Sequence, residues 1–224
     1  MYNNVIVIKE NVIRIGQRIA SACRRAGRDP AEITVIAVTK NRGIEEIKEA
    51  LANGLADIGE NRVQEALLKY NGLRDASARW HLIGHLQTNK AGDAVKMFTL
   101  IHSVDSLHLA EEINKQAAKI NKIQDILIEV NISGEASKFG VGPAETAALI
   151  KNISGLKNIN VKGLMTVAPI VEDPETARPY FRRLRELKDQ LKLAVLSMGM
   201  TGDFEAAVEE GATMVRLGRA IFEG

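Results

Sequence analysis

The chain has 224 residues, of which 46% are hydrophobic, and that content can bury one large α/β core or two smaller ones. Its 30 basic and 28 acidic residues leave a formal net charge of +2, which does not indicate the strongly basic surface that binds nucleic acid or an anionic membrane. The sequence shows no basic leader before a cleavage site and no apolar run of roughly 20 residues, so we expect a cytoplasmic protein with neither membrane nor nucleic acid as partner.

The first predicted element is a helix over residues 3–26, within an N-terminal segment of residues 1–28. Apolar residues recur at helical spacing along it, which is typical of one buried face. They are Val5, Ile8, Val12, Ile15, Ile19 and Ala22. We expect this helix to cap or flank the main domain. Cys23, the only cysteine, lies on the helix and is interpreted as a packing residue, because one cysteine forms no internal disulfide.

Eight short apolar runs follow, separated by longer helical patterns. The runs cover residues 33–39, 56–60, 79–84, 100–105, 125–132, 161–167, 194–199 and 213–218. Strands joined by helices are expected to be parallel, and continuous apolar strands need cover on both faces. The pattern predicts a single α/β domain over residues 1–224, a (β/α)8 barrel of the TIM type with reactive groups on the loops after the strands. The alternative, an open doubly wound sheet, lacks a G-x-G-x-x-G motif after its first strand.

Lys40 follows the first predicted strand, "ITVIAVT", and would lie at the reactive rim of the barrel. An apolar approach predicts that the amine is desolvated, which would lower its pKa and leave a neutral nucleophile that forms Schiff bases with aldehydes. The alternative is a solvated lysine in a surface salt bridge. The residues alone leave both interpretations open.

Polar residues also follow the second and third strands. Glu60 and Asn61 stand where a helix opens, and Asn61 could be its N-cap. His81 is a core histidine or a site residue, and His85 is a cap or the neighbour of a ligand. We expect no metal site, because Gly84 interrupts the helix that would align the two histidines and no paired cysteines exist.

The segment "LSMGMTGDF" joins the seventh strand to a helix that begins near Asp203. Hydroxyls and backbone N–H groups gather there, at a position where eightfold barrels commonly bind a phosphate. The residues concerned are Ser197, Gly199, Thr201 and Gly202. An ordinary turn capped by Asp203 is the alternative. Arg216 lies inside the eighth apolar strand and therefore needs a buried anion or acceptor. A reactive lysine, a phosphate cradle and a buried arginine are what pyridoxal 5′-phosphate (PLP) requires.

These motifs resemble the pyridoxal-phosphate homeostasis protein family, whose fold is that of the alanine racemase N-terminal barrel. The matching segments span nearly the whole chain: "AVTKNRGIEEI", "IGENRVQE", "WHLIGHLQTNK", "VNISGEASKFGV", "GLMTV" and "LSMGMTGDFEAAVEEGATMVRLGRAIF". The resemblance implies that Lys40 holds PLP as a Schiff base and that Arg216 faces its pyridine nitrogen. It further implies phosphate contacts from Ser197, from the backbone of Met198 to Thr201, which includes Gly199, and from Gly218. Asn61 would contact the ring, and His81 and Met165 would line the pocket.

Two residues depart from the family pattern. Thr201 replaces the usual serine but keeps the hydroxyl. Arg219 stands where many members have threonine, so a hydroxyl donor is lost and a cation is gained. Whether Arg219 binds the phosphate or turns outward is left open.

An arginine at the ring nitrogen predicts muted carbanion chemistry, because the guanidinium does not give up its proton. A racemase needs a second acid/base group, which alanine racemase takes from a tyrosine of an additional domain. The tyrosines of this chain, Tyr2, Tyr70 and Tyr180, are predicted in helices away from the rim. We therefore expect a monomeric carrier that acts in intracellular PLP homeostasis without robust catalysis, with PLP-dependent apo-enzymes as candidate partners. A minimal PLP-dependent amino-acid racemase, or a phosphosugar enzyme with a Schiff-base lysine and no cofactor, are the alternatives.

Overall fold

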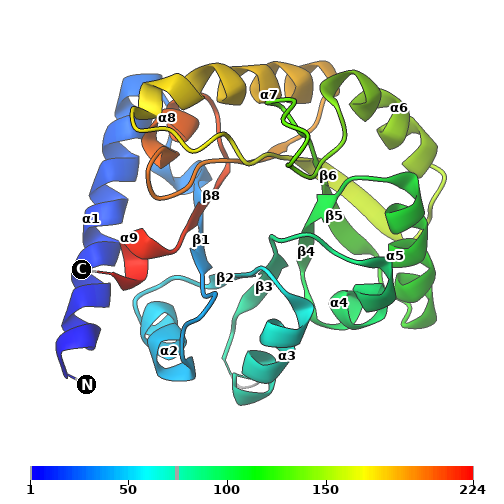
Figure 1. Ribbon diagram of the computed structural model, residues 1–224. Helices are drawn as coiled ribbons and strands as arrows, with labels where there is room; N and C mark the ends of the chain where they lie inside the picture. Colours follow the sequence, from blue (N-terminus) through cyan, green and yellow to red (C-terminus); the bar gives the residue numbers. More distant parts are fainter. Residues whose placement is uncertain (1, 74–75, 224) are drawn as a thin grey trace.

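The computed structural model describes residues 2–73 and 76–223, and its core is a closed barrel of parallel strands (Figure 1). Neighbouring strands pair in chain order, and β1 closes the barrel by pairing with β8. The strands are β1 (Thr34–Val38), β2 (Asp57–Glu60), β3 (Arg79–Leu82), β4 (Leu100–Val104), β5 (Gln124–Glu129), β6 (Ile159–Met165), β7 (Val195–Ser197) and β8 (Met214–Leu217). The predicted eight-stranded barrel is confirmed.

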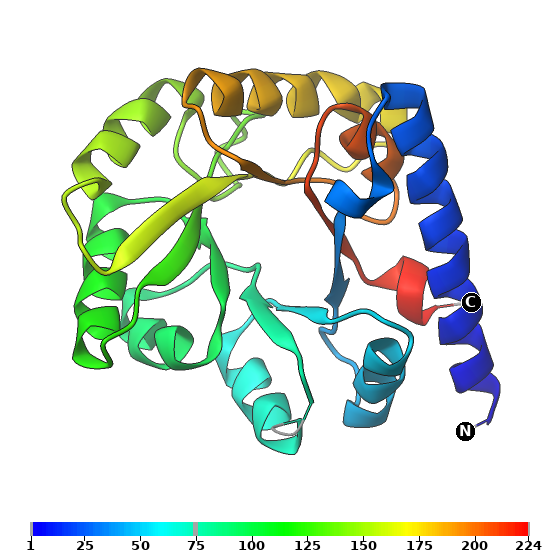
Figure 2. The same cartoon turned by 180° about the vertical axis from the view of Figure 1, so that it is seen from behind.

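Helices surround the barrel on its outer side (Figures 1 and 2). The α-helices are α1 (Tyr2–Ala26), α2 (Ile44–Ala52), α3 (Val63–Gly72), α4 (Ala91–Met97), α5 (Leu107–Lys119), α6 (Pro143–Ile153), α7 (Arg178–Gln190), α8 (Phe204–Glu209) and α9 (Arg219–Phe222). Three short 3-10 helices are η1 (Pro30–Glu32), η2 (Thr88–Lys90) and η3 (Pro174–Ala177). No helix of the described ranges is long and apolar enough to cross a lipid bilayer.

The strands form because their side chains are buried on both faces. Outward side chains such as Ile58 and Ile101 join the large core cluster beneath the helices. Inward side chains form a smaller cluster around Leu100, Leu127 and Met165. This two-sided burial explains why the sequence shows continuous apolar runs rather than an alternating pattern.

The barrel interior also contains polar side chains, and these come from several strands. They are Asp57, His81, His102, Ser197 and Arg216, and all are buried. Because buried polar groups need hydrogen-bond partners, their arrangement inside the barrel is constrained.

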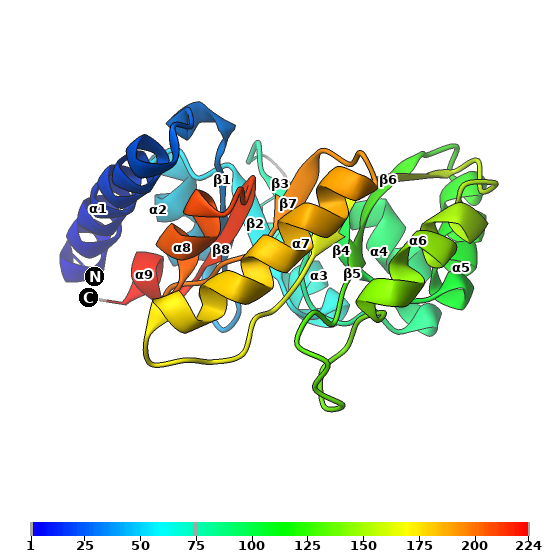
Figure 3. The same cartoon turned by 90° about the horizontal axis from the view of Figure 1, so that it is seen from above.

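The predicted N-terminal helix is present as α1 and lies beside α8 and α9 (Figures 1 and 3). Buried Asn11 donates to the carbonyl oxygens of Ile221 at 3.0 Å and Glu223 at 3.1 Å. Arg18 pairs with Glu205 at 2.8 Å. Since α8 and α9 are short, α1 supplies much of the helical cover on this side of the barrel.

The apolar face predicted for α1 is buried at most of its positions. Ile8, Ile15, Ile19 and Ala22 are buried and Val12 is half-buried, while the side chain of Val5 lies outside the described part of the chain. Cys23 is fully buried beside them, which agrees with a packing role, and burial raises the pKa of its thiol.

The largest boundary difference occurs in the fifth strand, which was expected over residues 125–132 and ends at Glu129. Val130 leaves the barrel ladder and forms an isolated bridge with Val141. The chain then returns along a loop that extends beyond the strands, as does the loop after β6 (Figure 3).

Candidate functional site

A cavity of about 510 Å³ lies at the carboxyl ends of the strands. Its walls come from the segments that follow β1, β2, β3, β6, β7 and β8. The lining residues are Val38, Lys40, Asn61, Ile83, Val167, Pro169, Ile170, Val171, Met200, Thr201, Gly202, Asp203, Arg216, Gly218 and Arg219. Six residues predicted to bind the cofactor are therefore brought together here: Lys40, Asn61, Thr201, Arg216, Gly218 and Arg219.

Lys40 lies in a tight turn that starts where β1 ends. The N–H of Arg42 donates to the carbonyl oxygen of Thr39 at 3.0 Å, and Asn41 has a φ of 60°. Lys40 itself is exposed, so the expected desolvation of its amine is wrong. The reason is that β1 ends at Val38, two residues before the lysine, and the turn carries the side chain out of the apolar layer.

A buried ion pair fixes the backbone next to Lys40. The ammonium group of Lys69, from α3, donates to the carbonyl oxygen of Thr39 at 2.6 Å and to Glu60 Oε1 at 2.7 Å. Burial raises the pKa of Glu60, although its hydrogen bonds with Lys69 and Thr39 oppose the shift. Lys69 was not predicted as a site residue. It lies three residues after Ala66, which lies three after Val63, and this spacing places its charge on the buried face of the helix.

Arg216 points from β8 towards the cavity and is buried. Its Nη1 donates to the hydroxyl oxygen of Ser197 at 2.7 Å, and its Nη2 donates to the carbonyl oxygen of Thr166 at 2.8 Å. Burial lowers the pKa of Arg216 to about 10, and the charges of Glu129 and Asp203 oppose this shift. The guanidinium therefore remains protonated at neutral pH, and the prediction that it needs buried acceptors is confirmed.

Ser197 and Met198 were predicted as phosphate ligands, but neither is among the residues that line the cavity. The hydroxyl of Ser197 is bonded to Arg216 and lies 2.9 Å from Nδ1 of His102. The backbone N–H of Met198 donates to the carbonyl oxygen of Met214 at 3.1 Å. Both residues thus belong to the inner wall of the barrel.

Gly199 does not line the cavity either, and its role is conformational. Its φ is +90°, and a Cβ atom at this position would lie 2.5 Å from the Cβ of Ala207. Glycine is therefore required for the chain to turn tightly from β7 towards α8.

The turn after Gly199 combines the two interpretations made from the sequence. Asp203 is the N-cap residue of α8 by position, but its side chain bonds the turn and not the helix, because its Oδ1 accepts from the N–H of Met200 at 2.6 Å. The same turn also presents Thr201 and Gly202 to the cavity. Arg219 is exposed but lines the cavity beside them.

Asn61 follows β2 directly and lines the cavity, but it is not the N-cap of α3. That position belongs to Arg62, which has extended backbone angles. Gly84, after β3, allows the two loops to touch, because a Cβ atom there would collide with the backbone oxygen of Asn61.

The three remaining candidates lie elsewhere. Met165 belongs to the apolar cluster inside the barrel, and His81 is buried with its Nε2 at 2.9 Å from Asp57 Oδ1. Both were expected to line the cavity, and neither does. His85 is exposed and its ring stacks on Phe139 at 4.0 Å between ring centroids.

The chemistry of the cavity suits a planar anionic ligand that carries an aldehyde. Lys40 offers a primary amine, and Arg216 and Arg219 offer guanidinium groups for anions or ring nitrogens. Ile83 and Ile170 supply apolar walls for a ring. The donor set therefore fits PLP.

Comparison with known proteins agrees with this geometry. Residues 11–224 match the family model of the alanine racemase N-terminal domain. The chain is 48% identical to a pyridoxal phosphate homeostasis protein of Aquifex aeolicus, over 95% of this chain and 96% of that protein. It is 41% identical to a protein of the same name from Pseudomonas aeruginosa, over 96% of this chain and 94% of that protein.

Solved structures show the same likeness. PipY of Synechococcus elongatus, with PLP bound, is similar at a TM-score of 0.81 and 36% identity, over 93% of this chain and 99% of that chain. An alanine racemase of Clostridium difficile is similar at a TM-score of 0.74 and 15% identity, over 96% of this chain and 56% of that chain. The second likeness concerns the fold alone.

Proposed function

Because the chain belongs to the pyridoxal phosphate homeostasis protein family, which has the alanine racemase N-terminal domain fold, we propose that it binds PLP in the carboxyl-end cavity and carries it reversibly. The observation that supports this proposal is the convergence of the Lys40 amine with the guanidinium groups of Arg216 and Arg219 in one cavity. When bound, PLP supplies an electrophilic aldehyde, a pyridine ring and a phosphate.

Lys40 is the residue proposed to hold the cofactor covalently. A neutral Nζ attacks an aldehyde carbon, and loss of water leaves a Schiff base that water or another amine reverses. Exposure of Lys40 keeps the attachment accessible to such an exchange. Anchoring of Thr39 by Lys69 holds the backbone from which the amine reaches the cavity.

Arg216 is proposed to face the pyridine nitrogen. It keeps further N–H groups beyond the two that bind Ser197 and Thr166. Since the guanidinium stays protonated, it donates a hydrogen bond to the ring nitrogen and does not transfer a proton to it. The ring is then a weak electron sink, which favours holding the cofactor over carbanion chemistry.

The phosphate is proposed to bind in the same cavity, between the segments after β7 and β8. The hydroxyl of Thr201 and the backbone of Gly218 lie there. Arg219 adds a positive charge in place of a neutral hydroxyl, and a charge-assisted bond to phosphate is stronger than a neutral one. Asn61 would contact the ring from the segment after β2.

The carrier role is proposed over a catalytic one because, among the described residues, the cavity lining contains no tyrosine, the group that the resemblance to alanine racemase would require as a second acid/base. Tyr70 and Tyr180 lie in α3 and α7, and neither lines the cavity. We propose a monomer that buffers intracellular PLP and passes it to apo-enzymes. Chiral chromatography of amino acids incubated with the loaded protein tests the racemase alternative, and turnover that is lost in Lys40→Ala would replace the carrier role.

The attachment site is tested by adding PLP to the purified protein, reducing with borohydride and mapping the labelled peptide by mass spectrometry. We expect the label on Lys40. A label on another lysine, or none after the visible absorbance band of an imine has formed, would contradict the proposed site.

A further inference from the structure

A continuous row of buried polar side chains crosses the inside of the barrel and ends at Arg216. Asp57 Oδ1 lies 2.9 Å from His81 Nε2, and His81 Nδ1 lies 3.0 Å from His102 Nε2. His102 Nδ1 then lies 2.9 Å from the hydroxyl oxygen of Ser197, which accepts from Arg216 Nη1 at 2.7 Å. We call these five residues the buried row. They come from β2, β3, β4, β7 and β8, so neighbours in the row are far apart in sequence.

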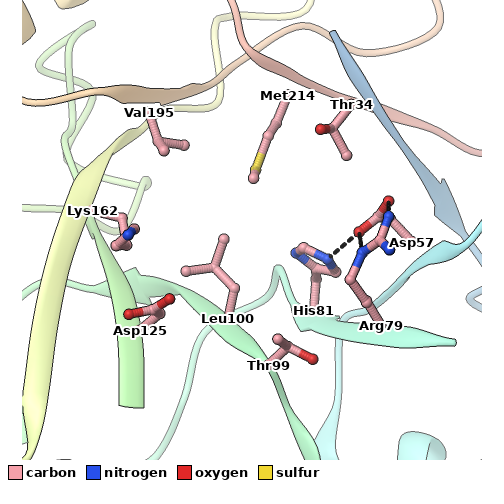
Figure 4. Close-up of a pocket in the computed structure, with 10 residues that line it drawn as sticks. All are labelled: Thr34, Asp57, Arg79, His81, Thr99, Leu100, Asp125, Lys162, Val195 and Met214. Carbon is pink, nitrogen blue, oxygen red and sulfur yellow. Dashed lines mark hydrogen bonds and ion pairs between the residues drawn. The ribbon is translucent and has the colours of Figure 1, made fainter. Parts of the chain in front are cut away.

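The buried row joins two cavities at opposite ends of the barrel. Arg216 lines the cavity proposed for the cofactor. Asp57 and His81 line a second cavity, of about 220 Å³, among residues at the amino ends of the strands (Figure 4). In Figure 4 the dashed line from His81 to Asp57 marks the start of the row, next to Arg79. Of the buried row, the proposed function uses only Arg216.

The proton positions along the row follow from its two ends. Burial alone would raise the pKa of Asp57, but hydrogen bonds from His81 and Arg79 outweigh it and lower the pKa, so the carboxylate is an acceptor. His81 must then donate from Nε2. Burial, and then the positive charge of Arg216, lowers the pKa of His102 well below its usual value, so that ring is neutral.

At the other end, the oxygen of Ser197 accepts from Arg216, so its own O–H needs a different acceptor. Nδ1 of His102 is the atom in contact with it. His102 therefore carries its proton on Nε2 and donates it to Nδ1 of His81. Every donor in the row then meets one acceptor, with Nε2–H tautomers at both histidines.

We propose that Asp57, His81 and His102 are positioning residues for Arg216, acting through Ser197. The carboxylate of Asp57 fixes the tautomer of each ring in turn, and the last ring orients the serine hydroxyl so that its lone pair faces the guanidinium. The effect on PLP rests on the proposed role of Arg216 in cofactor binding. The tautomers themselves are a property of the protein without ligand.

Without an acceptor at position 57, nothing fixes which ring nitrogens of the buried row donate and which accept. The rings can then donate towards Ser197, whose oxygen would have to accept from both His102 and Arg216. Arg216 would keep the carbonyl oxygen of Thr166 as its other partner and could rotate about it. The contact between guanidinium and pyridine nitrogen would weaken as a result.

The first test uses nitrogen-15 NMR of the four histidines in the protein without PLP. We expect two buried rings in the Nε2–H form, correlated through a shared proton. This test needs no variant, and an Nδ1–H form at His81 or His102 would overturn the proposal directly. Asp57→Ala should then give a mixture of tautomers.

Two variants distinguish the role of Asp57 as hydrogen-bond acceptor for His81 from its ion pair with Arg79. Asp57→Asn can keep an oxygen at the Oδ1 position, which accepts from both His81 and Arg79, so it should restore the wild-type tautomers. Arg79→Met removes the ion pair at Oδ2 while leaving the carboxylate, and Arg79 has a side chain that is 58% exposed. A purely structural role of Asp57 predicts that Arg79→Met and Asp57→Ala behave alike.

The second test measures PLP binding and the absorbance maximum of the bound cofactor. Asp57→Ala should bind PLP roughly tenfold more weakly and shift the maximum, because one hydrogen bond to a charged group is misplaced. Arg79→Met and Asp57→Asn should match the wild type. If the wild type does not bind PLP, the proposed function fails while the NMR result stands. If PLP binds equally to wild type and Asp57→Ala, the positioning role is wrong.

Discussion

The guanidinium of Arg216 and the hydroxyl of Ser197 are joined by a hydrogen bond of 2.7 Å inside the barrel. The serine lies at the end of β7 and the arginine within β8, and both are buried. Ser197 supports the arginine and does not line the cavity, so we expect it to act on a ligand only through Arg216. A supporting role and a direct phosphate contact predict different effects on ligands with and without a phosphate.

Replacing Ser197 with Ala should weaken the binding of PLP and of pyridoxal, which lacks the phosphate, by the same factor. Loss of a hydrogen bond to a charged group is worth about 1.5 to 3 kcal/mol, so we expect an effect of roughly 10- to 150-fold on both dissociation constants. Fluorescence or absorbance titration with each ligand measures it. A loss confined to PLP would restore Ser197 as a phosphate ligand.

Arg219→Met should show the opposite pattern. Because Arg219 lines the cavity on the side proposed for the phosphate, its removal should weaken PLP binding about tenfold and leave pyridoxal binding unchanged. Arg62→Met is the matched control, since Arg62 is exposed, follows β2 and does not line the cavity. Equal losses in the two variants would mean that Arg219 acts through net charge alone.

Lys40→Ala should abolish the covalent attachment of PLP, and Lys40→Arg should do the same although it keeps the positive charge. The reason is that a guanidinium does not act as a nucleophile at neutral pH. Mass spectrometry after borohydride reduction counts the adducts. Lys162→Ala is the control, because this exposed lysine lines the cavity at the other end of the barrel and should leave the adduct intact.

Glu129 should make the stability of the protein depend on pH. Burial, and then the charge of Asp105, raise its pKa from 4.5 to about 7, while Arg216 opposes the shift. Between these two values the folded protein binds more protons than the unfolded chain, so the free energy of unfolding falls as pH rises from 4.5 to about 7.

Urea unfolding of wild type and Glu129→Gln across this pH range measures the contribution of Glu129. The difference in stability between the two should change by up to about 3 kcal/mol, since one pKa unit corresponds to about 1.4 kcal/mol. An identical pH dependence in both proteins would show that Glu129 ionises normally.

Asn11→Ala should destabilise the protein by about 1 to 3 kcal/mol. The amide of Asn11 donates to two carbonyl oxygens near the end of the chain, and its removal leaves at least one of them buried without a partner. Arg24→Ala, an exposed position on the same helix, should stay within about 0.5 kcal/mol of wild type. If both variants unfold at the same urea concentration, Asn11 does not hold α1 in place.

The fold could be predicted because most strand residues are buried, on both faces of the sheet, so that the strands read as apolar runs. The positions of Lys40 and Asn61 at the rim could be predicted as well, because parallel strands in a barrel bring their carboxyl ends together, whereas Gly218 was expected only from the family resemblance. The exposure of Lys40 was misjudged because the end of the strand was placed at Thr39, one residue too late. A strand boundary shifted by one residue changes what surrounds the next side chain.

The buried row could not be predicted from the sequence. His81 and Asp57 are 24 residues apart, and His102 and Ser197 are 95 residues apart, so no local pattern links them. Side chains alternate along a strand, and the seventh run did not reveal whether Ser197 faces the barrel interior or the rim. Only the closure of the barrel decides that.

The β7–β8 interface is the least paired part of the barrel wall. Its strand register contains the single pair Ser197 and Met214, whereas β5 and β6 are paired along six residues of each strand. Backbone bonds outside that pair continue the interface, from the N–H of Thr213 to the carbonyl oxygen of Leu196 at 2.9 Å and from the N–H of Arg216 to that of Gly199 at 3.0 Å. Side chains add to them, because the hydroxyl of Thr213 bonds the backbone of Leu196, and Arg216 bonds Ser197. Amide hydrogens along this interface should therefore exchange with solvent earlier than those of β5 and β6. A ligand that contacts residues on both sides of the interface closes it, so occupancy of the cavity would be measurable as slower exchange in this part of the wall.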